Sequence, residues 1–117
     1  MEDILGKYPQ LDAFIPTGGF PQFVPDAYRA AVPPHKEKIA SGELALVVAD
    51  TLPVQIDLLK EGLSSGQVGQ RPVEMGDKSI FFLKDIAEGK PAPEDPTYTG
   101  LDVCTPETAD TCVGGSN

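Results

Sequence analysis

The chain contains no tryptophan and a single histidine, and aromatic residues make up only 7% of its 117 residues. A serine or cysteine nucleophile normally needs a histidine beside it, and zinc sites need histidine and cysteine ligands at short spacings. The one histidine, His35, lies between proline and charged residues and is expected to be solvated. We therefore predict no catalytic residue, no metal site and no cofactor.

Basic residues are also scarce: 9 lysines and arginines stand against 18 acidic residues, for a net charge of −9. Nucleic acids and anionic membranes are therefore poor partners. No apolar run reaches the roughly 20 residues of a membrane span. The start carries no signal peptide. Because residues 2–8 already have a helical pattern, we expect the chain to lack its natural beginning.

Cysteine is limited to Cys104 and Cys112, in a segment rich in turn-forming residues. A bridge between them would close a short loop and stabilise the fold by about 2.5 kcal/mol. We predict this disulfide, which would indicate an oxidising compartment. The alternative is two free thiols.

The most informative stretch runs from residue 44 to residue 70. An uninterrupted apolar run, 44–49, is typical of a strand that is buried on both faces of a parallel sheet. It ends at Asp50. Leucine and isoleucine then recur on one helical face up to Gly62, with Asp50 or Thr51 as candidate caps. Residues 65–70 follow as a second strand, which completes a βαβ unit.

The remaining pattern predicts one small α/β domain with about four strands. A short strand, 13–15, closes at Gly18-Gly19, where positive φ angles or a close approach to the backbone are expected. Two short helices should follow, at about 26–31 and 34–41. A longer helix spans about 72–88, and a last strand 98–103. The apolar stripe of that longer helix is predicted to be core: Val73, Gly76, Ile80, Leu83 and Ala87.

Asp50 and Gln70 each follow one of the two adjacent parallel strands. The carboxyl ends of such strands meet at one crevice, so the two side chains should converge. A carboxylate accepts two hydrogen bonds in a plane, which suits a vicinal diol, and a primary amide both donates and accepts. A ring such as Phe20 or Phe23 can cover an apolar sugar face. The sequence therefore indicates a small polyhydroxylated ligand.

These motifs resemble those of the periplasmic sugar-binding proteins of ABC importers, of the ribose-binding type. The resemblance is carried by Val47-Val48-Ala49-Asp50, by Gly66-Gln67-Val68-Gly69-Gln70, by the Thr17-Gly18-Gly19-Phe20-Pro21 turn, and by residues 99–107 with Cys112. In that family the aspartate and the glutamine 20 residues later both bind sugar hydroxyls. The resemblance implies the same role for Asp50 and Gln70, and it makes Gly18, Gly19 and Phe20 ligand-binding residues too, the two glycines through their backbone alone. Many relatives place asparagine or aspartate where this chain has Gly18-Gly19.

The resemblance implies part of a three-layer, doubly wound parallel sheet, the C-terminal portion of a type I periplasmic binding fold. Residues 1–70 would belong to the second lobe, 71–91 to a helix of the first lobe, and 92–117 to a hinge-crossing segment and a tail with the disulfide. The whole protein would bind a sugar or polyol in the periplasm and deliver it to a membrane permease. Alone, this chain should bind sugar weakly or not at all, and it should self-associate.

Two alternatives remain. The same fold serves as the effector-sensing domain of sugar-responsive transcriptional repressors, although a disulfide argues against a reducing cytosol. Asp50 also resembles the phosphoacceptor of a receiver domain, but the acidic pair and the lysine of that pattern are not in place.

Overall fold

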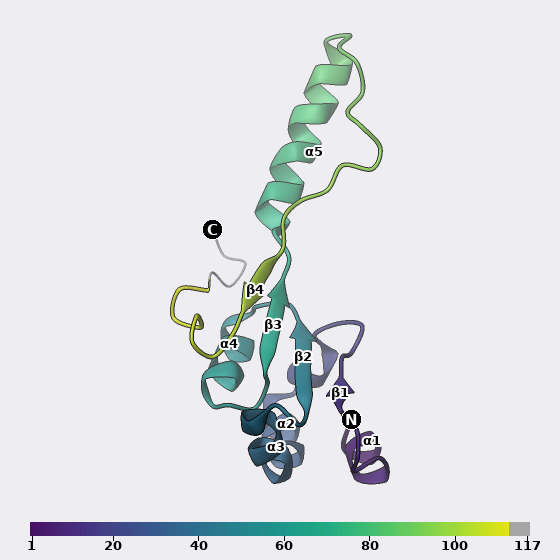
Figure 1. Ribbon diagram of the computed structural model, residues 1–117. Helices are drawn as coiled ribbons and strands as arrows, with labels where there is room; N and C mark the ends of the chain where they lie inside the picture. Colours follow the sequence, from purple (N-terminus) through teal and green to yellow (C-terminus); the bar gives the residue numbers. More distant parts are fainter. Residues whose placement is uncertain (113–117) are drawn as a thin grey trace.

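The fold is one four-stranded sheet with helices packed on it, and the computed structural model describes residues 1–112 (Figure 1). The strands lie in chain order and are β1 (Ala13–Phe14), β2 (Ala45–Ala49), β3 (Gly66–Gly69) and β4 (Asp102–Cys104). Strands β1, β2 and β3 are parallel. β4 runs antiparallel to β3 and starts later than the sequence predicted. The α/β class and the βαβ unit are confirmed.

The helices connect and follow these strands. They are α1 (Glu2–Lys7), α2 (Pro25–Ala31), α3 (Lys36–Ser41), α4 (Pro53–Lys60) and α5 (Pro72–Ala87), with short 3-10 helices η1 (Phe20–Gln22) and η2 (Pro33–His35). Gly42, Gly62 and Gly89 follow the ends of α3, α4 and α5 with positive φ angles. Glycine favours such left-handed exits because it has no Cβ to clash. Among residues 1–112, no helix is long and apolar enough to cross a membrane.

Helix α4 turns its predicted apolar face inward, with one exception at its start. Ile56 and Leu59 are buried, whereas Leu52 is 46% exposed and occupies the N-cap position. The prediction that Asp50 or Thr51 caps α4 was therefore wrong. Instead the Leu52 N–H donates to Oε1 of Gln55, three residues on, at 3.0 Å.

The core lies on one face of the sheet. Leu46 and Val48 of β2 are buried on this face, and the main cluster brings Leu46 together with residues of the helices and the loops: Leu5, Tyr28, Val32, Ile39, Leu44, Leu58 and Leu63. Residues paired across strands share a face. On the opposite face, Val68 is half-buried and its partner Val103 is 69% exposed. β2 is thus covered on one face, not on both as its apolar run predicted.

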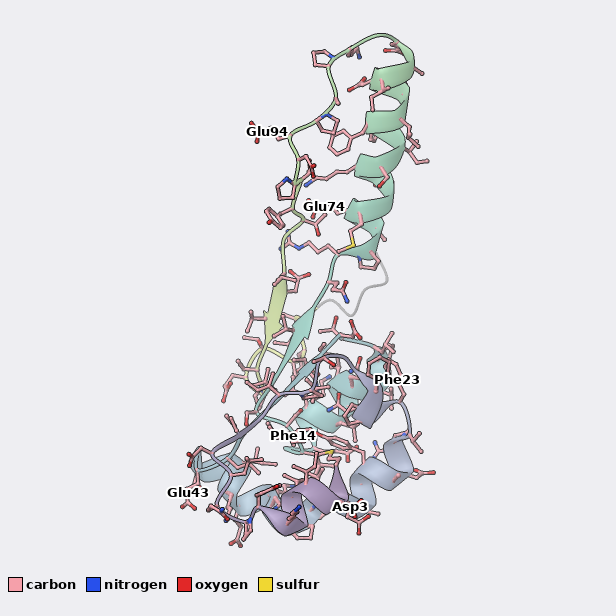
Figure 2. All side chains as sticks on the ribbon, turned by 90° about the vertical axis from the view of Figure 1, so that its right-hand side faces the viewer. Asp3, Phe14, Phe23, Glu43, Glu74 and Glu94 are labelled. Carbon is pink, nitrogen blue, oxygen red and sulfur yellow. A yellow bond between two sulfur atoms is a disulfide. The ribbon has the colours of Figure 1, made fainter. Side chains whose placement is uncertain are left out.

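Helix α5 extends away from this body, and the described molecule measures 58 × 27 × 23 Å (Figure 1). No residue of α5 is buried. Segment 90–101 returns beside the helix, and side chains of both line a groove between them (Figure 2). The prediction that the α5 stripe is core was therefore wrong for this chain: Ile80 and Leu83 are 67% and 65% exposed.

A disulfide joins Cys104 at the end of β4 to Cys112, as predicted. Cys104 is fully buried and packs in a second cluster with Ile56 and Leu59 of α4 and with Ala109. The bridge therefore fixes the segment after β4 against the sheet.

Candidate ligand-binding site

Asp50 lies immediately after β2 in a left-handed backbone conformation, with φ of 73°. Its N–H donates to the Val68 carbonyl at 2.8 Å, so the pairing between β2 and β3 continues through this residue. Aspartate tolerates this conformation better than most residues, but it still costs on the order of 1 kcal/mol. The cost implies that neighbouring contacts hold the turn in place.

Gln70 follows β3 and meets Asp50 directly. Its Nε2 donates to Oδ1 of Asp50 at 2.9 Å. The predicted convergence of these two side chains is therefore observed. Within residues 1–112, neither side chain makes another hydrogen bond, so Oδ2 of Asp50 and Oε1 of Gln70 can accept bonds from a ligand.

Gly19 lies against this carboxylate. A Cβ at Gly19 would approach Oδ2 of Asp50 and Cε1 of Phe23 to 2.9 Å, and the Ala49 carbonyl to 3.0 Å. Gly19 has an ordinary φ of −71°, so the expected positive φ is wrong and the expected close approach is observed. The turn needs glycine here for space.

Gly18 and Phe20 play a different part. A Cβ at Gly18 would lie 2.6 Å from the Phe20 ring, so Gly18 makes room for that ring. Phe20 is 70% exposed and packs edge-on against Phe23, with ring centroids 5.7 Å apart and planes at 73°.

A cavity of about 320 Å³ opens beside the Asp50–Gln70 pair. It is lined by Phe23, Asp50, Thr51, Leu52, Gln70 and Pro72. This volume is at the lower end of the range for small-molecule sites. Of the two phenylalanines proposed to face a ligand, Phe23 lines the cavity, whereas Phe20 contacts Phe23 and is not part of the lining. Within residues 1–112, no cluster of side chains is arranged to hold a metal ion.

A network of three fully buried glutamines lies beneath the site: Gln22, Gln55 and Gln67. Gln55 Nε2 donates to the Ala49 carbonyl at 2.8 Å and to Gln22 Oε1 at 3.0 Å. In the amide orientation that satisfies both of its ends, Gln67 donates to the carbonyls of Val48 and Asp50, at 3.0 and 3.3 Å, and accepts from Gln22.

Three consecutive carbonyls at the end of β2 are thereby bonded to buried side chains. Because buried amides with satisfied partners are rigid, this network can hold Asp50 in its left-handed conformation. The positioning role of these three glutamines was not predicted from the sequence. The available signal was three glutamines, one of them in the middle of the second predicted strand and one on the predicted helix.

Tyr28 extends the buried polar layer. Its hydroxyl donates to the Leu63 carbonyl at 2.8 Å. Burial raises the pKa of Tyr28 to about 12, and a hydrogen bond with Gln22 partly opposes this shift.

Arg71 joins the two segments that connect the sheet to α5. Its guanidinium donates to Asp102 from Nη2 at 2.8 Å and from Nε at 3.2 Å. This bond raises the pKa of Arg71 and lowers the pKa of the Asp102 carboxyl. Gly100 lies so close that a Cβ there would sit 2.5 Å from Nη1 of Arg71. The exit from β3 beside Gln70 is thus fixed to the entry into β4.

The fold is that of part of a type I periplasmic sugar-binding protein of the ABC importers. No protein-family model matches the chain, and no curated protein sequence matches it. Several solved structures, however, are similar to this chain.

The glucose–galactose binding protein GanP of Geobacillus stearothermophilus is 27% identical over 89% of this chain, with a TM-score of 0.66. A sugar-binding protein of a sugar ABC transporter from Bacillus halodurans is 24% identical over 96%, with a TM-score of 0.65. The fructose-binding periplasmic domain of a hybrid two-component system is 25% identical over 94%, with a TM-score of 0.62. The chain spans only 35%, 40% and 35% of these three chains.

Proposed function

We propose that this chain forms one wall of a sugar- or polyol-binding site, in which Asp50 and Gln70 bind ligand hydroxyls. The observation that supports this most strongly is the Gln70–Asp50 hydrogen bond at the edge of a cavity, which leaves one acceptor oxygen on each side chain without a side-chain partner among the described residues. Phe23 supplies an apolar ring for a sugar face. The proposal contains no catalytic step.

The whole protein would be the solute-binding component of an importer, located in the periplasm, which delivers its sugar to a membrane permease. In this proposal residues 1–70 belong to the second lobe, α5 to the first lobe, and residues 92–117 to a hinge-crossing segment and tail. The Arg71–Asp102 pair would then lie where two crossing segments meet. The sugar-binding proteins named above support the solute-binding function.

The wall alone should bind weakly. The described cavity is open and small, and a ligand held from one side keeps most of its hydration. We expect dissociation constants in the millimolar range from a nitrogen–proton NMR titration against pentoses, hexoses and polyols. Shifts should concentrate on the amides of Asp50, Gln70 and Phe23. Micromolar binding would contradict the one-wall interpretation.

Asp50→Asn tests the acid directly. The variant keeps the shape of the side chain but loses the charge and one acceptor, so the sugar-induced shifts should disappear. Asp57→Asn is the matched control, since Asp57 is an exposed acid on α4. If no sugar in the panel shifts the three site amides at all, or if Asp50→Asn binds like the parent chain, sugar recognition by this pair is refuted.

A sensory function is the second candidate, because one similar structure is a fructose-binding domain of a two-component system. In this alternative Asp50 and Gln70 would bind the ligand in the same way, and only the downstream partner would differ. The effector domain of a repressor remains a weaker alternative. The disulfide argues against it, since a cytosolic protein would keep its thiols reduced. Thiol titration of denatured, unreduced protein from cells distinguishes the two locations.

A further inference from the structure

Thr51 is the third polar residue in the lining of the cavity, beside Asp50 and Gln70. It is only 4% exposed, so the packing of the described residues already fixes its position. The sequence made it a candidate cap of α4, but the side chain of Gln55 caps that helix. The structure therefore leaves the Thr51 hydroxyl without the function expected for it.

The Thr51 hydroxyl has no hydrogen-bond partner among residues 1–112, yet it is not sealed inside the core. Every fully buried side-chain oxygen or nitrogen in this part of the chain has a partner. Because Oγ1 of Thr51 lacks one, it belongs to the small part of the residue that stays accessible where Thr51 lines the cavity. A nearly buried hydroxyl without a partner is costly, and a bond to a group inside the cavity removes that cost.

Gly69 makes room for this side chain at the end of β3. A Cβ at Gly69 would lie 2.6 Å from Oγ1 and 2.9 Å from Cγ2 of Thr51. Gly69 directly precedes Gln70, so Thr51 packs beside the amide of the site as well as following its acid. The branched side chain of threonine has few rotamers, and this close packing restricts it further. The hydroxyl is therefore held in place before a ligand arrives.

A sugar hydroxyl needs a donor as well as an acceptor for full satisfaction. It has one proton to give and lone pairs that accept. The Asp50 carboxylate can only accept, so it takes the proton and leaves the lone pairs of the ligand oxygen without a partner. A hydroxyl beside the carboxylate can donate to that oxygen or to a neighbouring one on the same ligand.

We propose that Thr51 is a third ligand-binding residue of this site, whose hydroxyl donates to a hydroxyl oxygen of the sugar or polyol that Asp50 binds. The inference rests on the proposed function and adds a donor to a pair dominated by acceptors. The competing interpretation is that Thr51 only fills the space above Gly69. In that case its methyl group matters and its hydroxyl does not.

Thr51→Val and Thr51→Ser separate these two interpretations. Valine keeps the branched shape and loses the hydroxyl, whereas serine keeps the hydroxyl and loses the methyl group. In the NMR titration, with the sugar that binds the parent chain most tightly, Thr51→Val should raise the dissociation constant by about three- to tenfold. Thr51→Ser should leave it nearly unchanged.

Stability should respond in the opposite order. Thr51→Ser should lower the urea midpoint, because a buried methyl group is lost, and Thr51→Val should leave it unchanged or raise it. Thr111→Val is the matched control, since Thr111 is an exposed threonine in the loop that the disulfide closes, and it should not change the affinity. Affinity and stability that fall together in one variant would indicate packing alone.

Monodeoxy analogues of the same sugar identify the oxygen that Thr51 contacts. One analogue should bind the parent chain more weakly and be insensitive to Thr51→Val, because the bond is already missing. The proposal is overturned if Thr51→Val binds like the parent chain, if Thr51→Ser loses as much affinity as Thr51→Val, or if every analogue remains sensitive to Thr51→Val. Loss of binding in Asp50→Asn but not in Thr51→Val refutes this inference alone, whereas a parent chain that binds no sugar refutes the proposed function and this inference with it.

Discussion

The buried glutamine network offers the sharpest test of how this chain positions its site. Gln55→Leu removes the donor that serves both the Ala49 carbonyl and Gln22 Oε1. A buried acceptor left without a partner costs about 1 to 3 kcal/mol, so the two together should cost about 2 to 6 kcal/mol. The Leu52 N–H also loses its hydrogen bond to Gln55, but Leu52 is half-exposed, so its N–H can donate to water instead.

A loss of this size is a large share of the about 5 to 15 kcal/mol that stabilises a domain. With a urea dependence of about 1 to 2 kcal/mol per molar, the unfolding midpoint should fall by at least about 1 M. Circular dichroism is the suitable signal, since the chain has no tryptophan. Gln10→Leu, at an exposed position, is the control and should change stability by no more than about 0.5 kcal/mol.

The double variant Gln22→Leu/Gln55→Leu separates a network from independent bonds. Each single variant leaves the other glutamine without its partner in the Gln55–Gln22 hydrogen bond, whereas the double variant removes both groups together. The loss of stability in the double variant should therefore be clearly less than the sum of the losses in the two single variants. Additive costs, or a Gln55→Leu effect no larger than the Gln10→Leu effect, would show that the amides do not hold the end of β2.

Three further predictions concern the same body. Gly19→Ala should lower the unfolding midpoint and shift the NMR signals of Asp50, because the new Cβ displaces the turn, whereas Gly6→Ala in α1 meets no atom and should be neutral or slightly stabilising. Reducing the disulfide should cost about 2.5 kcal/mol in urea unfolding, on the chain-entropy account, and a midpoint unchanged by reductant would contradict this. Tyr28 has a folded pKa of about 12 against 10 for the free side chain, so its stabilisation is complete below pH 10 and is lost between pH 10 and 12, by about 2 to 3 kcal/mol. Tyr28→Phe should remove that pH dependence, and an unchanged alkaline limb would exclude Tyr28 as its source.

Local patterns predicted most of the elements correctly. The run before Asp50, the helical spacing after it, and the glycines at helix ends each depend on neighbouring residues alone. The convergence of Asp50 and Gln70 also followed from the parallel order of β2 and β3, since parallel strands end at the same edge. The position of these side chains was therefore predictable from topology.

Burial was less predictable, because it depends on what covers a surface. The α5 stripe has the spacing of a core helix, and nothing in its sequence distinguishes an internal partner from an external one. The same holds for β2. Its apolar run is typical of a strand that is buried on both faces, but the described residues cover only one face. The capping of α4 by Gln55 was also hidden, since the cap comes from a residue inside the helix and reaches back to Leu52.

The strained turn at Asp50 and the buried amides below it are best understood together. A carboxylate that must present a free oxygen to a ligand cannot be fixed by many bonds of its own, so its position has to come from the backbone. Gln55 and Gln67 donate to the backbone carbonyls of residues 48–50, and the Asp50 carboxylate itself is left with one side-chain partner, Gln70. If this reasoning is correct, Gln55→Leu should broaden or shift the NMR signals of Asp50 and Gln70 even under conditions where the sheet stays folded. Site signals identical to those of the parent chain in such a folded variant would refute it.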